Sequence, residues 1–350
     1  MIKKFGIIYA VLVTQLIASP FTIVSSEGGV TIYKKKFSNG SIDYVQEIDL
    51  SKGAKIKLLV GEVDSIEYNY GDNKGDKSWI RTQSIKESWN NSINENKNTE
   101  CIINGEYFGK KKYTRLSTLS YPVKIDGEIY DGSSSIYKKY QKVLNINNEN
   151  VSMEKFDSLK NMRNWDSSIV GLDTSLKYGG NKQAEKRKGR TYIGILDKNK
   201  DKINETILIY SSKYANQKDA KDTLISFGAI SKNIMMLDGG GSSQLICNGK
   251  NFVKSSRKLP QFIATIKGES QDLSYEDKVN FVFDGLEKKH SFYFPKGSKT
   301  EKYQGNFYRT YNVRGKYHTL YAYNKKIYYN VGSGYKLYYT VDAWYNYLNK

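Results

Sequence analysis

The stretch LDGGGSS at residues 237–243 decides how this chain is interpreted, because it follows directly on an apolar strand predicted at 233–237. Three successive glycines give up backbone entropy and packing, at a cost of up to ~1 kcal/mol each relative to alanine. The glycines are therefore expected where another part of the chain or a ligand lies close to the backbone, or where φ is positive. Amides in such a run can form a nest for an anion, and two hydroxyls can add donors. The residues that this interpretation assigns to anion binding are Gly239, Gly240, Gly241, Ser242 and Ser243.

Asp238 stands at the mouth of this loop, where it can act as a general acid or base or hold a cation. The plainer alternative is a tight turn in which the aspartate and the serines only cap the backbone. Composition alone leaves both interpretations open.

Other segments have a similar character. In NGEYF, at 104–108, the amide of Asn104 and the carboxylate of Glu106 lie at a strand end among aromatics. In GRT, Arg190 and Thr191 open an apolar strand, and arginine is the side chain best shaped to fork onto a phosphate. Arg257, before the strand at 262–266, is a further candidate. Taken singly, each of these segments is better explained by a structural role than by a site.

Histidine chemistry is excluded from the large N-terminal region, because the two histidines are His290 and His318. There is also no P-loop sequence and no HExxH motif. Carboxylates, hydroxyls, arginine and backbone amides remain, a set suited to glycosyl or phosphoryl transfer.

Hydrophobic periodicity predicts a domain of many strands and few helices. A hairpin turns at Asp126 and Gly127, and Gly228 is expected to end the second of two helices. Strands are expected at 30–36, 42–50, 55–60, 101–108, 190–196, 206–210, 233–237 and 262–266, and helices at 73–98 and 216–227.

The order of these motifs resembles the phosphodiester glycosidase family, the relatives of the mannose-6-phosphate uncovering enzyme. NGEYF, GRTYIGI, a helix ending in FGA, MLDGGGSSQL and SSRKLPQFIATI follow one another over residues 101–266. The resemblance implies a mixed-sheet α+β domain whose strand ends converge on one cleft. It also implies hydrolysis of the glycosidic bond in a sugar-1-phosphodiester. Glu106, where the family usually has a small residue, and the basic loop at 109–112 depart from the pattern and put the substrate in doubt.

Carried over by motif, the resemblance predicts Asp238 and Asn104 as site residues. A carboxylate is needed to activate water or to stabilise the positive sugar, and for this role Asp238 is the first choice and Glu106 the second. The resemblance also predicts substrate or phosphate binding by the two arginines, Thr191 and the loop; the full binding set is Arg190, Thr191, Gly239, Gly240, Gly241, Ser242, Ser243 and Arg257. No cofactor is required, and a divalent cation at Asp238 has no ligand cluster to support it.

The N-terminus has the build of a secretory signal peptide. Lys3 and Lys4 precede an apolar run at 5–18 that is shorter than the ~20 residues of a membrane span. We expect cleavage near Ser26, with an uncleaved anchor as the alternative. The net charge of +19 would draw an exported protein to anionic wall polymers rather than to nucleic acid.

Cys101 and Cys247 are the only cysteines, and each lies beside one of the motifs on a segment predicted to be a neighbouring strand. In an oxidising compartment they can form one disulfide. The alternative is two buried thiols that pack as small hydrophobic side chains.

The composition changes near 267–272, and half of the 30 tyrosines lie in the last 80 residues. Short alternating runs there predict a small all-β module, which resembles the surface-layer-protein anchoring domain of lactobacilli. Tyrosine and lysine suit sugar rings and anionic polymer, whereas tyrosines that merely fill a thin core are the alternative. The predicted organisation is a signal peptide at 1–26, the glycosidase-like domain at 27–269 and the wall-binding module at 272–350.

The chain is thus predicted to be a secreted, wall-associated hydrolase that cleaves sugar-1-phosphodiester linkages in envelope glycopolymers. Two alternatives stay open: a phosphodiesterase that cuts the other side of the phosphate, and a non-catalytic protein that binds wall polysaccharide.

Overall fold

A computed structural model describes most of the chain and divides it into two compact units, residues 1–269 and 270–350. Most of the predicted signal peptide, residues 1–20, lies outside the described part, as does most of the basic loop at 109–112 and His290. The described residues are 21–67, 77–109, 115–130, 132, 136–148, 150–268, 275–289, 300–303, 306–313, 316–330, 335–341, 343 and 344.

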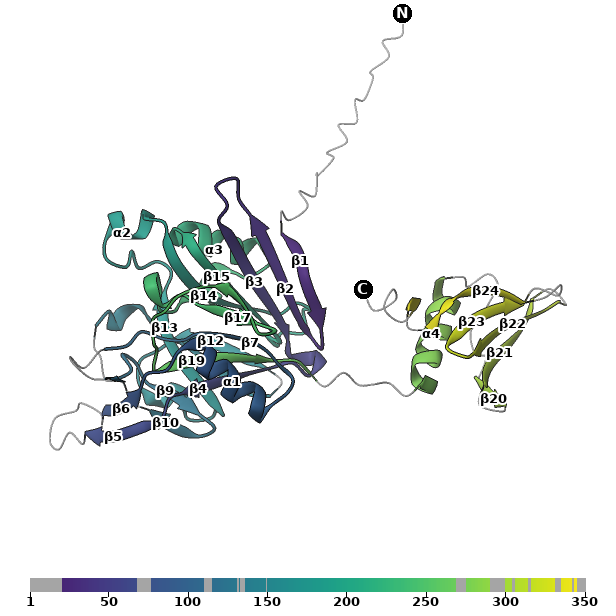
Figure 1. Ribbon diagram of the computed structural model, residues 1–350, viewed down its shortest axis with the longest axis horizontal. Coiled ribbons are helices and arrows are strands. Elements are labelled where there is room, and N and C mark those ends of the chain that lie inside the picture. The colour runs from purple at the N-terminus through teal and green to yellow at the C-terminus, as the bar shows by residue number, and fades with distance from the viewer. Residues whose placement is uncertain are drawn as a thin grey trace, which may run out of the picture. The chain divides into compact units, whose positions relative to one another are not determined.

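The first unit contains two large sheets (Figure 1). The larger sheet has the strand order β1-β2-β3-β15-β14-β16-β13-β11-β12, with β9 and β10 attached beside β13. Its strands are β1 (Thr22–Glu27), β2 (Val30–Lys36), β3 (Ile42–Asp49), β9 (Val123–Ile125), β10 (Glu128–Tyr130), β11 (Gln141–Ile146), β12 (Val151–Lys155), β13 (Ser167–Asp173), β14 (Lys188–Leu196), β15 (Thr206–Ala215) and β16 (Ile234–Met236).

The smaller sheet has the order β18-β17-β7-β19-β4, and a separate three-stranded sheet is ordered β5-β6-β8. Every strand pairing among the described residues is antiparallel, so the prediction of a mixed sheet was wrong. Consecutive strands such as β1 and β2 or β14 and β15 form antiparallel pairs, and neighbours distant in the sequence, such as β3 and β15, are antiparallel as well. The strands are β4 (Lys55–Val60), β5 (Val63–Glu67), β6 (Lys77–Arg81), β7 (Thr99–Asn104), β8 (Leu116–Ser117), β17 (Leu245–Cys247), β18 (Lys250–Val253) and β19 (Gln261–Ile266).

Helices pack on the outer faces of both sheets. Alternate residues of a strand point to opposite sides of a sheet, so one strand can contribute to the core between the sheets and to the outer core under a helix. Cys101 and Ile103 of β7 belong to the core between the sheets, whereas Ile102 packs towards α1. On the larger sheet, Ala220 and Leu224 of α3 join the outer core. The helical segments are α1 (Ile85–Glu95), α2 (Asn181–Glu185), α3 (Gln217–Ser226), η1 (Leu50–Lys52), η2 (Lys138–Tyr140), η3 (Leu159–Met162), η4 (Ser231–Asn233) and η5 (Gly240–Ser242).

The predicted helix at 73–98 is correct only in its second half. Residues 77–81 form β6, and α1 begins after a Ser84–Glu87 capping box. In this strand Ser78 and Ile80 are buried and Trp79 between them is less so, a period of two that is typical of a strand rather than of the helix we predicted. The hairpin at Asp126–Gly127 and the helix that ends before Gly228 are confirmed.

The glycine-rich loop is the link between the two sheets. It leaves β16 in the larger sheet and enters β17 in the smaller one, where β17 pairs with β7. Its neighbours are therefore the end of β7 and the first residues of β14. The strand ends that carry the predicted motifs meet at this link.

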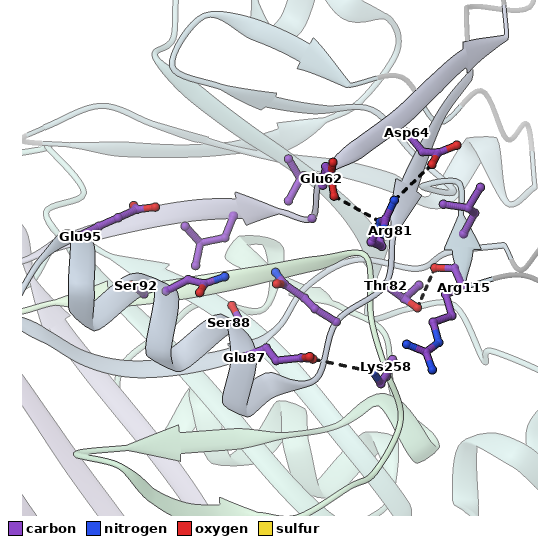
Figure 2. A pocket seen from close by; sticks show the side chains of 16 residues that line it. Glu62, Asp64, Arg81, Thr82, Glu87, Ser88, Ser92, Glu95, Arg115 and Lys258 are labelled. Carbon is purple, nitrogen blue, oxygen red and sulfur yellow. Dashed lines mark hydrogen bonds and ion pairs between the residues drawn. The ribbon is translucent and has the colours of Figure 1, made fainter.

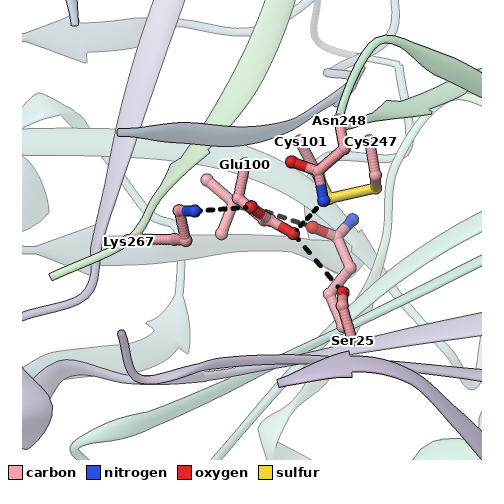
Figure 3. Close-up of a disulfide and its surroundings, with 8 residues drawn as sticks. Ser25, Glu100, Cys101, Cys247, Asn248 and Lys267 are labelled. Carbon is pink, nitrogen blue, oxygen red and sulfur yellow. Dashed lines mark hydrogen bonds and ion pairs between the residues drawn. A yellow bond between two sulfur atoms is a disulfide. The ribbon is translucent and has the colours of Figure 1, made fainter. Parts of the chain in front are cut away.

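A disulfide joins Cys101 to Cys247 (Figure 3), so the paired-cysteine alternative is the correct one. The two residues are direct partners in the β7–β17 ladder, with Cα atoms 4.1 Å apart. Beside them the buried carboxylate of Glu100 accepts a hydrogen bond from Asn248 Nδ2 at 2.6 Å and lies 3.4 Å from Lys267 Nζ. Ser25 Oγ donates to the same carboxylate at 3.4 Å and so connects β1 to the smaller sheet.

Strand β1 contains residues 22–27, the last part of the predicted signal peptide, and forms the edge of the larger sheet. The cleavage site near Ser26 stays a prediction; a cut there would remove most of this strand. Within the described residues, the structure has no helix with the length and apolar character to span a membrane.

The second unit combines one helix with a five-stranded antiparallel sheet ordered β20 to β24. The predicted strands are present, but residues 275–289 form α4, so the module is not all-β. Apolar residues of α4 recur at helical spacing, as in Val279, Val282, Phe283 and Leu286, and pack on the sheet. The elements are α4 (Tyr275–Lys289), β20 (Glu301–Tyr303), β21 (Asn306–Val313), β22 (Lys316–Tyr323), β23 (Lys326–Asn330) and β24 (Tyr335–Thr340).

Candidate active site

A small cavity of about 80 Å³ lies where β14, β16 and the glycine-rich loop meet. It contains one carboxylate and two cationic side chains beside tyrosine rings. Its lining residues are Tyr107, Tyr178, Lys188, Arg190, Thr191, Tyr192, Met236, Leu237, Asp238, Gly239 and Gly240. Five of the residues that the motifs predicted therefore line this cavity: Arg190, Thr191, Asp238, Gly239 and Gly240.

Asp238 is the only carboxylate among these lining residues. Burial raises its pKa from 3.8 to about 6, and the Ser242 hydroxyl, the Gly239 amide and the charges of Arg257 and Lys188 limit the rise. The Gly239 N–H donates to Asp238 Oδ1 at 2.8 Å. This amide therefore binds the side chain of the catalytic candidate and not the anionic ligand that the glycine-rich sequence had suggested. At neutral pH the carboxylate is mostly ionised and can serve as a base or an electrostatic stabiliser.

Asn104 joins the motifs without lining the cavity. It is buried at the end of β7, and its Nδ2 donates to the backbone carbonyl of Asp238 at 2.8 Å. Its Oδ1 accepts from Thr191 Oγ1 at 2.8 Å and from the Gln244 N–H at 3.1 Å. Thr191 Oγ1 also lies 3.2 Å from Ser243 Oγ. Asn104 and Ser243 are thus positioning residues.

Close backbone approach explains two glycines of the site. A Cβ on Gly189 would lie 2.1 Å from the Gly240 carbonyl oxygen, and one on Gly239 would lie 2.9 Å from the Gly189 carbonyl oxygen. Gly240 has φ +63°, a conformation that glycine adopts at no steric cost. The glycines let the loop pack directly against the start of β14, which brings Asp238 beside Lys188 and Arg190.

Arg190 is buried and donates mainly to backbone carbonyls around α2. Its Nε donates to Ala215 O at 3.2 Å, and its Nη2 donates to Gln183 O at 2.9 Å and to Lys186 O at 3.1 Å. Burial lowers its pKa below the usual value, although the guanidinium remains a cation. In the described part of the chain Nη1 has no hydrogen-bond partner, so one nitrogen remains for a ligand in the cavity that Arg190 lines.

Replacing Arg190 with lysine is expected to destabilise the protein by about 3 kcal/mol. A lysine ammonium cannot reproduce the forked donation to Ala215 and to the carbonyls near α2, and each unmade bond to a buried carbonyl costs ~1–3 kcal/mol. Urea unfolding of Arg190→Lys, with the more exposed Arg187→Lys as control, measures the loss. A change below about 1 kcal/mol would contradict this structural role.

Two other predicted residues, Glu106 and Ser242, are buried and do not line the Asp238 cavity. Glu106 accepts a hydrogen bond from the Tyr121 N–H at 3.3 Å. Ser242 accepts from Arg257 Nη1 at 3.0 Å. Asp238 is therefore the better placed of the two carboxylates.

Arg257 belongs to a second hollow of about 500 Å³ that begins at Gly241 and also contains Arg115 and Lys258. A third, larger hollow of about 700 Å³ runs between α1 and β6 (Figure 2). It shares Arg115 and Lys258 with the second hollow. In it Arg81 pairs with Glu62 at 3.3 Å, whereas the predicted motif residues lie elsewhere. The largest of these three hollows therefore contains none of the predicted site residues.

The motif analysis missed Lys188 and the tyrosines of the cavity. Burial and the neighbouring cation Arg190 lower the pKa of Lys188, whereas the charge of Asp238 opposes this shift. Tyr107 stacks on Tyr178 with ring centroids 5.3 Å apart, and burial together with the Asp238 charge raises the pKa of both phenols. The hydroxyl of Tyr192 is buried at this wall without a hydrogen-bond partner. Lys188 could have been found two residues before Arg190, where an alternating strand places side chains on the same face.

The comparisons with known proteins agree with the motifs on the type of domain. Residues 97–265 match the family model of the phosphodiester glycosidases, a segment that holds all of the predicted site residues. This segment of the chain is therefore similar to the phosphodiester glycosidase domain.

Two solved structures are similar to this chain. A hypothetical protein from Synechocystis is 12% identical, with a TM-score of 0.42 over 72% of this chain and 64% of its own. The catalytic domain of zebrafish N-acetylglucosamine-1-phosphodiester alpha-N-acetylglucosaminidase, auto-inhibited by its pro-peptide, is 14% identical, with a TM-score of 0.44 over 72% and 84%. This chain thus spans less than two thirds of the Synechocystis protein. Among curated proteins the search found no match.

Proposed function

We propose that this protein hydrolyses the glycosidic bond of sugar-1-phosphodiesters and releases a free sugar and a phosphomonoester. The observation that carries the proposal is the cavity in which Asp238, with a pKa near 6, lies beside Lys188 and Arg190. Its support from sequence is the family match over residues 97–265.

The arrangement suits this reaction electrostatically. As the bond between the anomeric carbon and the phosphate oxygen breaks, its electron pair goes to that oxygen and produces a phosphomonoester. The charges of Lys188 and Arg190 stabilise this leaving group and reduce the need for an acid. The ionised carboxylate of Asp238 takes a proton from the attacking water or stabilises the positive sugar.

A polymeric substrate is supported by the shape and charge of the neighbouring surface. The Asp238 cavity is far smaller than the ~300–1,000 Å³ of pockets that enclose whole ligands, so it would hold only the reacting part. The hollow beside Gly241 offers Arg115, Arg257 and Lys258 to further anionic units. We therefore propose glycopolymers of a cell envelope as the substrate class.

The second unit is proposed to bind an anionic wall polymer. Its core is filled mainly by aliphatic and phenylalanine side chains, with Tyr311 and Trp344 as buried exceptions. Tyr323 is 51% exposed and stacks on Tyr321 with centroids 6.2 Å apart, which leaves aromatic faces for sugar rings. Export to the wall is proposed from the N-terminal sequence and the charge of +19.

The deciding experiment incubates the protein with N-acetylglucosamine-1-phosphodiester and follows phosphorus and proton NMR. Free reducing sugar with a phosphomonoester supports the proposal, whereas sugar-1-phosphate moves the cut to the other side of phosphorus. The Asp238→Asn variant should be inactive, and Asp222→Asn, which changes an exposed carboxylate on α3, serves as the matched control. If several sugars remain intact while the protein still binds purified walls, the non-catalytic alternative replaces the enzyme.

A further inference from the structure

The hairpin loop between β14 and β15 contains an alternating row of oxygen-bearing side chains. In DKNKDKINE, residues 197–205, Asp197, Asn199, Asp201 and Glu205 occupy odd-numbered positions with lysines between the first three. The motif resemblance and the active-site cavity make no use of this loop.

Three of these side chains converge in space. Asp197, Asp201 and Glu205 each contribute one carboxylate oxygen, and these oxygens all lie within 4.8 Å of one another. Backbone amides fold the loop around them: the Lys202 N–H donates to Asp197 Oδ2 at 2.7 Å and the Ile203 N–H to Asp201 Oδ1 at 2.8 Å. Lys202 adopts φ +77°, a left-handed conformation that a long side chain rarely takes.

The interleaved lysines do not neutralise this cluster. Lys198 turns its ammonium to Glu47 on β3. Within the described residues, no lysine or arginine forms an ion pair with Asp197, Asp201 or Glu205. Three carboxylates this close repel one another unless a cation or proton lies between them.

Glu205 supplies an independent indication of a ligand. Its residue is 5% exposed, and its Oε2 is buried without a hydrogen-bond partner. The other oxygen, Oε1, accepts from the Lys198 N–H at 2.9 Å and so fixes the carboxylate at the base of the loop. A buried carboxylate oxygen without a donor is costly, and a bound cation would satisfy it.

From this geometry we propose a Ca²⁺ site formed by Asp197, Asp201 and Glu205. An all-oxygen set on a hairpin loop suits Ca²⁺, which accepts irregular coordination by carboxylates, amides and water. Mg²⁺ demands a stricter octahedron, and Zn²⁺ prefers nitrogen and sulfur ligands. The loop follows the end of β14 opposite to Arg190, so the cation would fix the hairpin rather than take part in hydrolysis.

The test uses the full protein, freed of metal with a chelator and then titrated with CaCl₂ in a calorimeter. We expect one site with a Kd of about 10⁻⁴–10⁻³ M, the range of extracellular calcium modules, and at least ~10-fold weaker binding of Mg²⁺. Saturating Ca²⁺ should raise the melting temperature by about 5 °C.

Two variants locate the site. Asp201→Asn changes an exposed ligand and should weaken Ca²⁺ binding at least ~10-fold, and Glu205→Gln should do the same. Asp222→Asn, on α3, should bind like the wild type. The proposal is overturned if no Ca²⁺ binds at concentrations up to about 10 mM, ten times the weakest expected Kd. It is also overturned if Mg²⁺ binds as tightly as Ca²⁺, or if Asp201→Asn keeps the wild-type affinity for Ca²⁺. Because Asp201 is exposed, Asp201→Asn is expected to fold, so this variant tests the site even if Glu205→Gln does not fold.

Discussion

Asp238→Asn is expected to lower hydrolysis of a sugar-1-phosphodiester by about a thousandfold while it stabilises the fold. A positioned acid or base contributes ~10²–10⁴-fold to rate, and an amide cannot accept the proton of the attacking water. Wild-type activity should fall as the pH drops through about 6, because protonation of Asp238 then removes the ionised form. Rates measured from pH 4 to 8 test both expectations.

The gain in stability follows from the raised pKa of Asp238. The unfolded carboxyl ionises near 3.8 and the folded one near 6, so protonation favours the folded state. This stabilisation is complete below pH ~4 and is lost as the pH rises through about 6. At pH 7 the neutral asparagine should therefore raise the free energy of unfolding by about 1–2 kcal/mol, less than the full shift implies because the residue is partly exposed.

Asp222→Asn is the matched control for both readouts, since its carboxylate lies on α3 and pairs with Lys218 at the surface. It should leave activity and stability within error of the wild type. An Asp238→Asn variant that keeps a tenth of the activity would remove Asp238 from the chemistry. A loss of stability at pH 7 would show that the carboxylate is not destabilised in the fold.

Loss of the Cys101–Cys247 disulfide should cost about 3–5 kcal/mol of folding free energy. The bond closes a loop with a sequence separation of 146 residues, and the chain-entropy model gives ~5 kcal/mol for a loop of this length. Urea unfolding of the wild type with and without a reductant measures the difference.

The Cys101→Ala/Cys247→Ala variant should match the reduced protein and should no longer respond to the reductant. A wild type that unfolds at the same urea concentration in both conditions would contradict the prediction. Two titratable thiols in unreduced, denatured protein would show that the bond does not form.

The sequence identified the strands around the site because their apolar residues run without interruption into polar motifs. Asp238 and Arg190 were predicted to share a cleft, and they line one cavity. The tyrosine wall was not predicted: Tyr178 lies outside every motif, and only the fold stacks it on Tyr107.

Other features of the site could not be predicted, because partners distant in the sequence decide how a side chain is held. Arginine is a common phosphate ligand, but in Arg190 Nε donates to the Ala215 carbonyl of β15 and Nη2 donates to carbonyls in and beside α2. No spacing in the sequence indicates these partners. Glu106 has the chemistry of a catalytic carboxylate but accepts from the Tyr121 N–H. Helix α4 was missed because its apolar run also suits a strand, and packing on the tyrosine-rich sheet selects the helix.

The disulfide also determines what a protease can do to this molecule. Asn104, Arg190 and Asp238 all lie between its two cysteines, so one cut anywhere in that span leaves both fragments covalently joined. The strands β7 and β17 would remain paired beside the glycine-rich loop. A nicked chain would then migrate as two pieces only on a reducing gel, and it would keep its active-site residues on one tethered body.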